Sequence, residues 1–357
     1  MAQKNPLLKG TNMKTWILAF AVLLLSSSSF AEIRHLPLGP GKMIAFEHIE
    51  NTPTAPTLIL LPGVNRGLSS NDTSVRILIK QGWNLLLPSL PAHPRSIEGL
   101  KKTEIPYFSM TNSIRSADFA KDITELVHAL GIKKAVPVTL SYTSSIGAYL
   151  NDQEFPHIIE TVPLVVPTES DPNAAKTAEL WESWFKLNPF MAPFWIRQFR
   201  DQAYTTHWSN TVDKNLSADK DFYGESPRVS DIKKGYVTIA RAAEDFNFAE
   251  WNFNTEERTR DFVIAEQENP ERLKNQVQVL KNYLASGKPL RVILVQNVGH
   301  VLPTENPTAY AATLGLLLRQ PRKAQTQFAV VSTAKSVDSI EWKDRSALEA
   351  WIKENQR

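Results

Sequence analysis

The sequence predicts an α/β protein with a mostly parallel central sheet, helices on both faces and a helical insertion that caps the sheet. Three observations predict this class. Short apolar segments rich in branched residues alternate with segments of helical periodicity, as in βαβ units. A long stretch near the middle of the chain is crowded with aromatic residues and contains no strand-like segment. Beyond it, strand-like and helical segments alternate again.

The predicted strands of the first half are short, and Pro, Gly or polar clusters bound them. They span residues 43–48, 57–61, 83–87, 135–140 and 158–166. A helix is expected between the third and the fourth strand, where apolar side chains recur on one face and Gly131 ends the helix. That face consists of Phe119, Ile123, Leu126, Val127 and Leu130. Strands that alternate with helices in this way are covered on both faces.

Residues 168–254 are predicted to form the cap. Aromatic side chains gather here, and prolines divide the stretch into short helices. Most of these aromatics are expected to pack the cap onto the sheet. Trp181, Trp184 and Phe185 lie within about one helical turn, so at least one of them is expected to face a cleft and contact the substrate.

The sheet is predicted to resume with strands at 262–265 and 291–296, followed by a helix at 308–318. The tail holds a further candidate strand, 328–332, and a candidate helix that Asp344 caps. Leu348, Trp351 and Ile352 share one face of that helix, so the tail is expected to pack on the core. The predicted organisation is a signal peptide (1–31), a core in two parts (32–167 and 255–320) around the cap (168–254), and a C-terminal extension (321–357).

The N-terminus resembles a secretory signal peptide. Lys14 precedes an apolar run from Trp16 to Leu25, and small residues lead to Ala31, after which cleavage is expected. The run is too short to span a bilayer comfortably, so no stable membrane span is expected after cleavage; an uncleaved anchor is the alternative. The mature protein is therefore predicted to be periplasmic or secreted.

Composition excludes several classes of function. The formal net charge is only +3 and no dense Lys/Arg run occurs, so no nucleic-acid partner is expected. The chain contains no Cys, which removes disulfides, thiolate metal sites and a Cys nucleophile. It shows no metal-ligand spacing and no cofactor motif, so neither a metal nor a cofactor is predicted.

A candidate nucleophile follows the strand at 135–140. Strand, small polar residues and a helix-like segment succeed one another around Ser141, the context that a strained nucleophile elbow requires. A Ser hydroxyl needs a neighbouring base to become nucleophilic at neutral pH. Thr143 and Ser144 are the alternative nucleophiles, and a simple helix start capped by Ser or Thr is the alternative structure.

Two further segments supply a base and an acid. His300 lies in a loop directly after the strand at 291–296, and such loops often carry functional residues. The strand at 262–265 is followed by two carboxylates, Glu266 and Glu268. Either of them could accept a hydrogen bond from an imidazole and so orient it.

The order Ser, acid, His, each after a strand, resembles the serine hydrolases of the α/β-hydrolase fold over about residues 43–319. The resemblance implies that Ser141 is the nucleophile, Glu268 the acid and His300 the base. Gly63 follows a strand where the family has its oxyanion loop. The backbone N–H groups of Val64 and Tyr142 are therefore the implied oxyanion hole.

The chain departs from the family pattern at three points. Thr139 and Thr143 stand where the elbow usually has glycines, Pro62 stands in place of a His before Gly63, and the acid is Glu where Asp is more frequent. These changes bear on activity and substrate more than on the fold.

The implied activity is hydrolysis of a carboxylic ester through an acyl-enzyme, with a small-molecule ester or acyl substrate. An amidase or peptidase on the same fold is one alternative, in which Glu179, Glu182 or Asp201 of the cap would bind a substrate amine. The other alternative is a catalytically inactive binding protein that keeps the fold.

Overall fold

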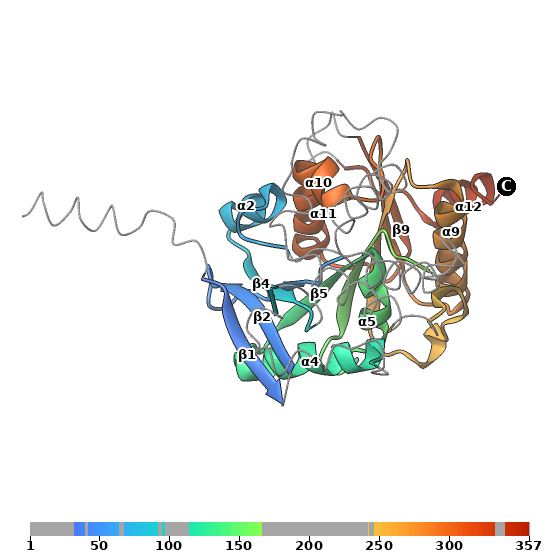
Figure 1. Cartoon of the computed structure of the whole chain (residues 1–357). Helices are drawn as coiled ribbons and strands as arrows, with labels where there is room; N and C mark the ends of the chain where they lie inside the picture. The colour runs from blue at the N-terminus through green and yellow to red at the C-terminus, as the bar shows by residue number, and fades with distance from the viewer. Residues whose placement is uncertain are drawn as a thin grey trace, which may run out of the picture.

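The computed structural model describes residues 32–39, 42–63, 68–91, 95–96, 114–165, 242, 246–332 and 340–356. The predicted signal peptide and most of the predicted cap lie outside these residues. Within them a nine-stranded sheet forms the centre, and helices cover both of its faces (Figure 1).

The sheet has the strand order β1-β2-β4-β3-β5-β6-β7-β8-β9. β2 is antiparallel to both β1 and β4, and every later pair is parallel. The strands are β1 (Arg34–Gly39), β2 (Lys42–Ile49), β3 (Thr57–Leu60), β4 (Asn84–Ser89), β5 (Ala135–Leu140), β6 (His157–Thr161), β7 (Thr259–Ala265), β8 (Arg291–Val295) and β9 (Gln327–Val331). Since parallel strands end at the same edge of a sheet, the loops after β3, β5, β7 and β8 open toward one side.

The predicted core strands are confirmed, with β6 shorter than expected. β6 ends at Thr161 because Val162 has a φ of 39°, which turns the backbone out of the extended conformation. The sequence does not predict β1, in which exposed and half-buried residues surround Pro37. A proline is tolerated there because β1 is an edge strand.

Two groups of helices enclose the sheet. One face carries α4 (Ser116–Ala129), α5 (Ser144–Tyr149), α9 (Pro270–Ala285) and α12 (Arg345–Glu354). The other carries α2 (Thr73–Lys80), α10 (Leu302–Glu305) and α11 (Pro307–Arg319) (Figure 1). The predicted helices α4 and α11 are confirmed. Of the helices in the described ranges, none has the length and apolar character needed to cross a bilayer.

Alternating side chains divide the core into two apolar layers. Along β7, Phe262 and Ile264 pack in the layer with α9, whereas Val263 and Ala265 pack in the layer with α11. All four are fully buried. Complete burial of a large apolar side chain contributes about 1.5–3 kcal/mol. Packing against the helices on both faces therefore contributes most of the stability of the parallel strands.

The described end of the predicted cap segment packs in the same layer as α9. Two short 3-10 turns, η5 (Phe248–Glu250) and η6 (Phe253–Thr255), bring Phe248 and Phe253 together with ring centroids 5.5 Å apart. Phe253 also meets Tyr283 of α9 edge to face, at 5.1 Å. Phe248 and Phe253 of this segment thus belong to the packing of the core.

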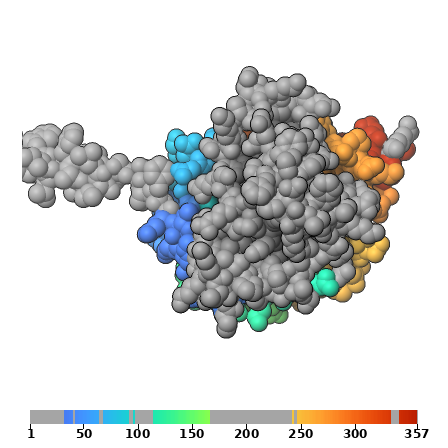
Figure 2. All heavy atoms as spheres, in the orientation of Figure 1, coloured from blue at the N-terminus to red at the C-terminus, as the bar shows by residue number. Residues whose placement is uncertain are grey.

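The C-terminal tail supplies the last strand of the sheet. β9 pairs with β8, and α12 begins after Asp344, whose side chain accepts the Ala347 N–H at 3.3 Å. Leu348 and Ile352 are buried, and Trp351 packs on Phe328 of β9, as expected from their shared helical face. The β1–β2 hairpin and these C-terminal elements lie at opposite sides of the molecule (Figure 2).

Candidate active site

Ser141 lies on a sharp turn between β5 and α5. Its φ is 56°, a left-handed conformation that a non-glycine residue adopts only under constraint. The 3-10 turn η2 (Ser141–Thr143) starts here, and the Thr143 hydroxyl closes it. That hydroxyl donates to the Leu140 carbonyl at 3.1 Å and accepts the Leu140 N–H at 2.9 Å. The result is a strand–turn–helix elbow with Ser141 at its tip.

Thr139 fits beneath this elbow because its neighbours accommodate it. A Cβ added to Gly147 of α5 would lie 2.7 Å from the Thr139 Cγ2, so the helix approaches as closely as a glycine allows. The Thr139 hydroxyl donates to Glu160 of β6, which also pairs with Arg260 of β7; both charged residues are fully buried. Burial raises the pKa of Glu160, although Arg260 and the Thr139 hydroxyl oppose this shift. A packed, hydrogen-bonded threonine thus replaces the usual glycine.

His300 joins Ser141 to Glu268. The His300 Nε2 lies 2.7 Å from the Ser141 Oγ, and the His300 Nδ1 lies 2.5 Å from the Glu268 Oε2. With its proton on Nδ1, the imidazole donates to Glu268 and accepts from the Ser141 hydroxyl. Three loops that are distant in sequence therefore meet in one chain of hydrogen bonds.

The hydroxyls of the other two candidate nucleophiles, Thr143 and Ser144, have other partners than His300. Thr143 is fully buried, and its hydroxyl is engaged with the backbone of Leu140. Ser144 is also fully buried, with its Oγ 3.4 Å from the Thr139 hydroxyl. Among the three, the geometry favours Ser141, because its hydroxyl is the one bonded to His300.

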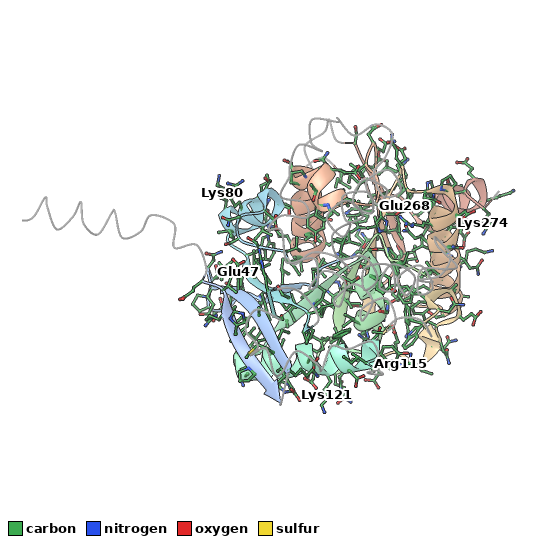
Figure 3. All side chains as sticks on the ribbon, in the orientation of Figure 1. Glu47, Lys80, Arg115, Lys121, Glu268 and Lys274 are labelled. Atoms are coloured by element: carbon green, nitrogen blue, oxygen red, sulfur yellow. The ribbon has the colours of Figure 1, made fainter. Side chains whose placement is uncertain are left out.

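Glu268 is ordered by several groups besides the imidazole. Its Oε1 accepts the Asn269 N–H at 2.9 Å and lies 3.7 Å from Arg272, while the Gln276 amide lies 3.4 Å from Oε2. Burial by itself raises the pKa of Glu268, but His300, Arg272 and the Asn269 N–H outweigh it and lower the pKa below its usual value. The carboxylate is therefore ionised at neutral pH. It lies at the upper end of the sheet, far from Lys121 of α4 (Figure 3).

The two carboxylates that the sequence leaves as alternatives have different partners. Glu268 meets the imidazole. Glu266 instead accepts the Asn297 N–H at 3.0 Å and the Gln296 side-chain amide at 3.1 Å, so it braces the loop before His300.

Arg272 and Gln276, which hold Glu268 in place, are not predicted from the sequence. Both lie on α9, a helix that is itself not predicted. A signal for it is present: Asn269 accepts the Glu271 N–H at 3.0 Å as a helix cap, and Pro270 occupies the first turn. A helix starting there carries residues four and eight positions after Glu268 along one face.

The predicted oxyanion hole is described only in part. Tyr142 follows Ser141 directly, which puts its backbone N–H at the start of the helical segment. Val64 lies outside the described residues, but the chain that leads to it runs beside the elbow. Leu61 N–H donates to Val138 of β5 at 2.9 Å, and a Cβ on Gly63 would lie 3.9 Å from the Leu140 side chain. The predicted substrate-binding residues Trp181, Trp184 and Phe185 also lie outside the described residues.

The site brings together a hydroxyl, an imidazole and a carboxylate, the groups of acid–base and nucleophilic catalysis. In the part of the chain that the structure describes, no cluster of three or more His, Asp or Glu side chains is arranged to hold a metal ion.

Comparison with solved structures identifies the fold. An α/β-hydrolase enzyme from a Medee basin deep-sea metagenome library superposes with a TM-score of 0.60 at 16% identity, over 82% of this chain and 99% of that one. An enol-lactonase from Burkholderia xenovorans gives 0.59 at 13% identity, over 80% and 100%. A thermophilic esterase from Thermogutta terrifontis gives 0.58 at 15% identity, over 81% and 98%.

No protein-family model matches the chain, and no curated protein sequence matches it. The structural matches span nearly the whole of the three solved chains, and the order and direction of the strands agree with a mostly parallel sheet flanked by helices. The chain therefore has the α/β-hydrolase fold, as predicted from the sequence.

Proposed function

We propose that this chain is a serine hydrolase that cleaves a carboxylic ester of a small molecule through an acyl-enzyme. One observation carries the proposal: the imidazole of His300 is bonded on one side to the hydroxyl of Ser141 and on the other to the carboxylate of Glu268. A serine hydroxyl becomes nucleophilic at neutral pH when a base accepts its proton and a carboxylate orients that base.

In the first half of the reaction, the Ser141 Oγ attacks the ester carbonyl carbon while His300 Nε2 takes its proton. The carbonyl oxygen becomes an oxyanion, to which the N–H groups of Tyr142 and Val64 would donate. The tetrahedral species then collapses, the C–O bond to the alcohol breaks, and His300 returns the proton to the leaving alkoxide. The acyl group remains on Ser141.

In the second half, water replaces the alcohol. His300 takes a proton from the water, whose oxygen attacks the acyl carbonyl, and the proton then goes back to the Ser141 oxygen as the carboxylic acid leaves. Glu268 stays ionised throughout and stabilises the imidazolium that forms twice per turnover. Its lowered pKa supports this role.

The proposal extends to the aromatic cap and to the location of the protein. Trp181, Trp184 and Phe185 would give the cleft an apolar lining suited to an apolar acyl or aromatic group. Export and cleavage after Ala31 would leave the whole sheet intact, since β1 begins at Arg34. Periplasmic recovery of a mature chain whose first residue is Glu32 would support export; a cytoplasmic chain that retains residues 1–31 would contradict it.

A fluorophosphonate probe, which reacts covalently with activated serines, tests the activity. We expect labelling of the wild type, mapped to the peptide that contains Ser141, and none in Ser141→Ala. Ser346→Ala, a change at an exposed serine of α12, is the matched control and should label normally.

Absence of labelling in the wild type would contradict the proposal and favour a binding protein on the same fold. Labelling that persists in Ser141→Ala would assign the nucleophile elsewhere. Faster turnover of peptides than of p-nitrophenyl esters would favour an amidase or peptidase.

A further inference from the structure

The loop that carries His300 is short, and carboxylates hold it from both ends. Toward β8, Asn297 has a φ of 55°, and its N–H donates to Glu266 at 3.0 Å. The Gln267 N–H donates to the Val298 carbonyl at 2.9 Å, which ties the loop after β7 to the loop after β8. These contacts end two residues before the imidazole.

A second carboxylate acts on the imidazole's own neighbours. The Gly299 N–H donates to the Glu305 Oε2 at 2.7 Å, and the Val301 N–H donates to the Glu305 Oε1 at 3.2 Å. One carboxylate oxygen of Glu305 therefore binds the residue before His300, and the other oxygen binds the residue after it. Hydrogen bonds to an ionised carboxylate are stronger than those between neutral groups, so this pair is a firm hold on the backbone.

Glu305 is itself held in place by helices. The N–H groups of Thr304 and Glu305 both donate to the Val301 carbonyl at 2.9 Å, which forms the single turn of α10. Asn306 then caps α11 by accepting the Ala309 N–H at 2.9 Å. α11 is anchored by buried Tyr310 and Leu314 in the layer shared with α2. We call the two hydrogen bonds from Gly299 and Val301 to Glu305 the clamp. Through the clamp, the packed helix α11 restrains the loop that carries His300.

The position of the imidazole requires such a support. Its two ring nitrogens must keep distances of 2.7 Å to Ser141 and 2.5 Å to Glu268 at the same time. A misplacement of about 1 Å can cost on the order of a hundredfold in rate. A loop residue has fewer packing contacts than a strand or helix residue to prevent such shifts, so hydrogen bonds to its backbone carry that task.

We propose that Glu305 is a positioning residue for His300: its carboxylate fixes the peptide groups on both sides of the base and so holds the imidazole between Ser141 and Glu268. The proposal rests on the hydrolase function proposed above. It assigns a role to a residue that touches neither the substrate nor the reacting atoms.

The first test measures steady-state hydrolysis of a p-nitrophenyl ester by Glu305→Gln and Glu305→Ala. We expect kcat to fall by about tenfold in Glu305→Gln and by about a hundredfold in Glu305→Ala, because Gln keeps one acceptor oxygen and Ala keeps none. KM should stay within about twofold of the wild type, since substrate contacts are unchanged. A rise in KM with unchanged kcat would overturn the proposal.

Glu266→Gln is the matched control. It removes the same charge from a carboxylate that binds the same loop, but at Asn297, three residues before the base. Its kcat should remain within about twofold of the wild type. Equal losses in Glu266→Gln and Glu305→Gln would show general loosening of the loop and would overturn the assignment to Glu305.

A second readout needs no turnover. The proton that His300 Nδ1 donates to the Glu268 carboxylate should give a far-downfield proton NMR signal. We expect this signal to be sharp in the wild type and in Glu266→Gln, and broadened by exchange with water in Glu305→Gln. A signal that stays sharp in Glu305→Gln would overturn the clamp.

The two proposals can fail separately. If the wild type neither hydrolyses esters nor reacts with the fluorophosphonate while the NMR signal responds as expected, the proposed function fails and the clamp stands.

Discussion

Two different kinds of structure bring the hydroxyl of Ser141 and the imidazole of His300 to 2.7 Å. The elbow around Ser141 is held by close packing: Thr139 lies against Gly147 of α5, and Thr143 and Ser144, which follow in the chain, are fully buried. The loop around His300 is held laterally, by carboxylates that accept its backbone N–H groups. Close side-chain packing thus supports the nucleophile, whereas hydrogen bonds from backbone N–H groups to carboxylates support the base.

This difference explains how a threonine fits at position 139 of the elbow. A glycine of the elbow can be exchanged for threonine where a neighbouring helix leaves room and a carboxylate such as Glu160 accepts the new hydroxyl. In the loop, by contrast, each carboxylate has a distinct partner, so an exchange there leaves backbone donors unsatisfied. Changes of volume should therefore disturb the elbow, and loss of the Glu305 carboxylate, which binds the residues on both sides of His300, should disturb the base.

The largest effect is expected from removal of the base. His300→Ala should lower kcat about ten-thousandfold, because it removes the base that is hydrogen-bonded to the Ser141 hydroxyl. The free energy of unfolding should fall by about 1–3 kcal/mol, because the buried Glu268 carboxylate loses its imidazole donor. Ester hydrolysis and urea unfolding measure the two quantities. His128→Ala, at an exposed histidine of α4, is the control. Wild-type rates in His300→Ala would remove this residue from the mechanism.

Glu268→Gln should lower kcat about a thousandfold, because the new amide can donate toward Nδ1 and so favours the wrong imidazole tautomer. Glu266→Gln should have a far smaller effect, since its partners are Asn297 and Gln296. Kinetics of both variants on one ester make the comparison. The reverse ranking would reassign the acid.

The same substitution has a consequence for stability against pH. The folded pKa of Glu268 lies below the ordinary value of 4.5. Its ionised form therefore contributes stability that is present above that value and is lost as the pH falls through the folded pKa. The difference in unfolding free energy between the wild type and Glu268→Gln should accordingly be smaller at pH 3 than at pH 7. A difference that grows in acid would contradict the direction of this shift.

Much of this arrangement can be predicted from the sequence, for identifiable reasons. The strands before Ser141 and His300 are buried on both faces, so they appear as short apolar segments, and the loops that follow them carry the polar residues. Chain order and loop position predict Ser141 and His300, and the resemblance to serine hydrolases implies Glu268 as the acid.

What the sequence could not supply was the support around these residues. Arg272 and Glu305 act through contacts between separate elements, and a charged residue in a helical segment is more often a solvated surface group. The choice between Glu266 and Glu268 likewise depends on which side of a turn each carboxylate faces, which neither spacing nor composition specifies.

The smallest expected effect tests the elbow by volume. In Gly147→Ala, the new methyl group would lie 2.7 Å from both the Thr139 Cγ2 and the Ile158 Cδ1, so α5 must shift. We expect a loss of about 1–3 kcal/mol in the free energy of unfolding. The loss of kcat should be smaller than in His300→Ala or Glu268→Gln. Thr139→Ser removes the facing methyl group but keeps the hydroxyl that binds Glu160. In a double-mutant cycle, Gly147→Ala should therefore cost less in the Thr139→Ser background. Strictly additive losses would mean that the helix is not packed against Thr139, and that the elbow, like the loop, is held by its hydrogen bonds.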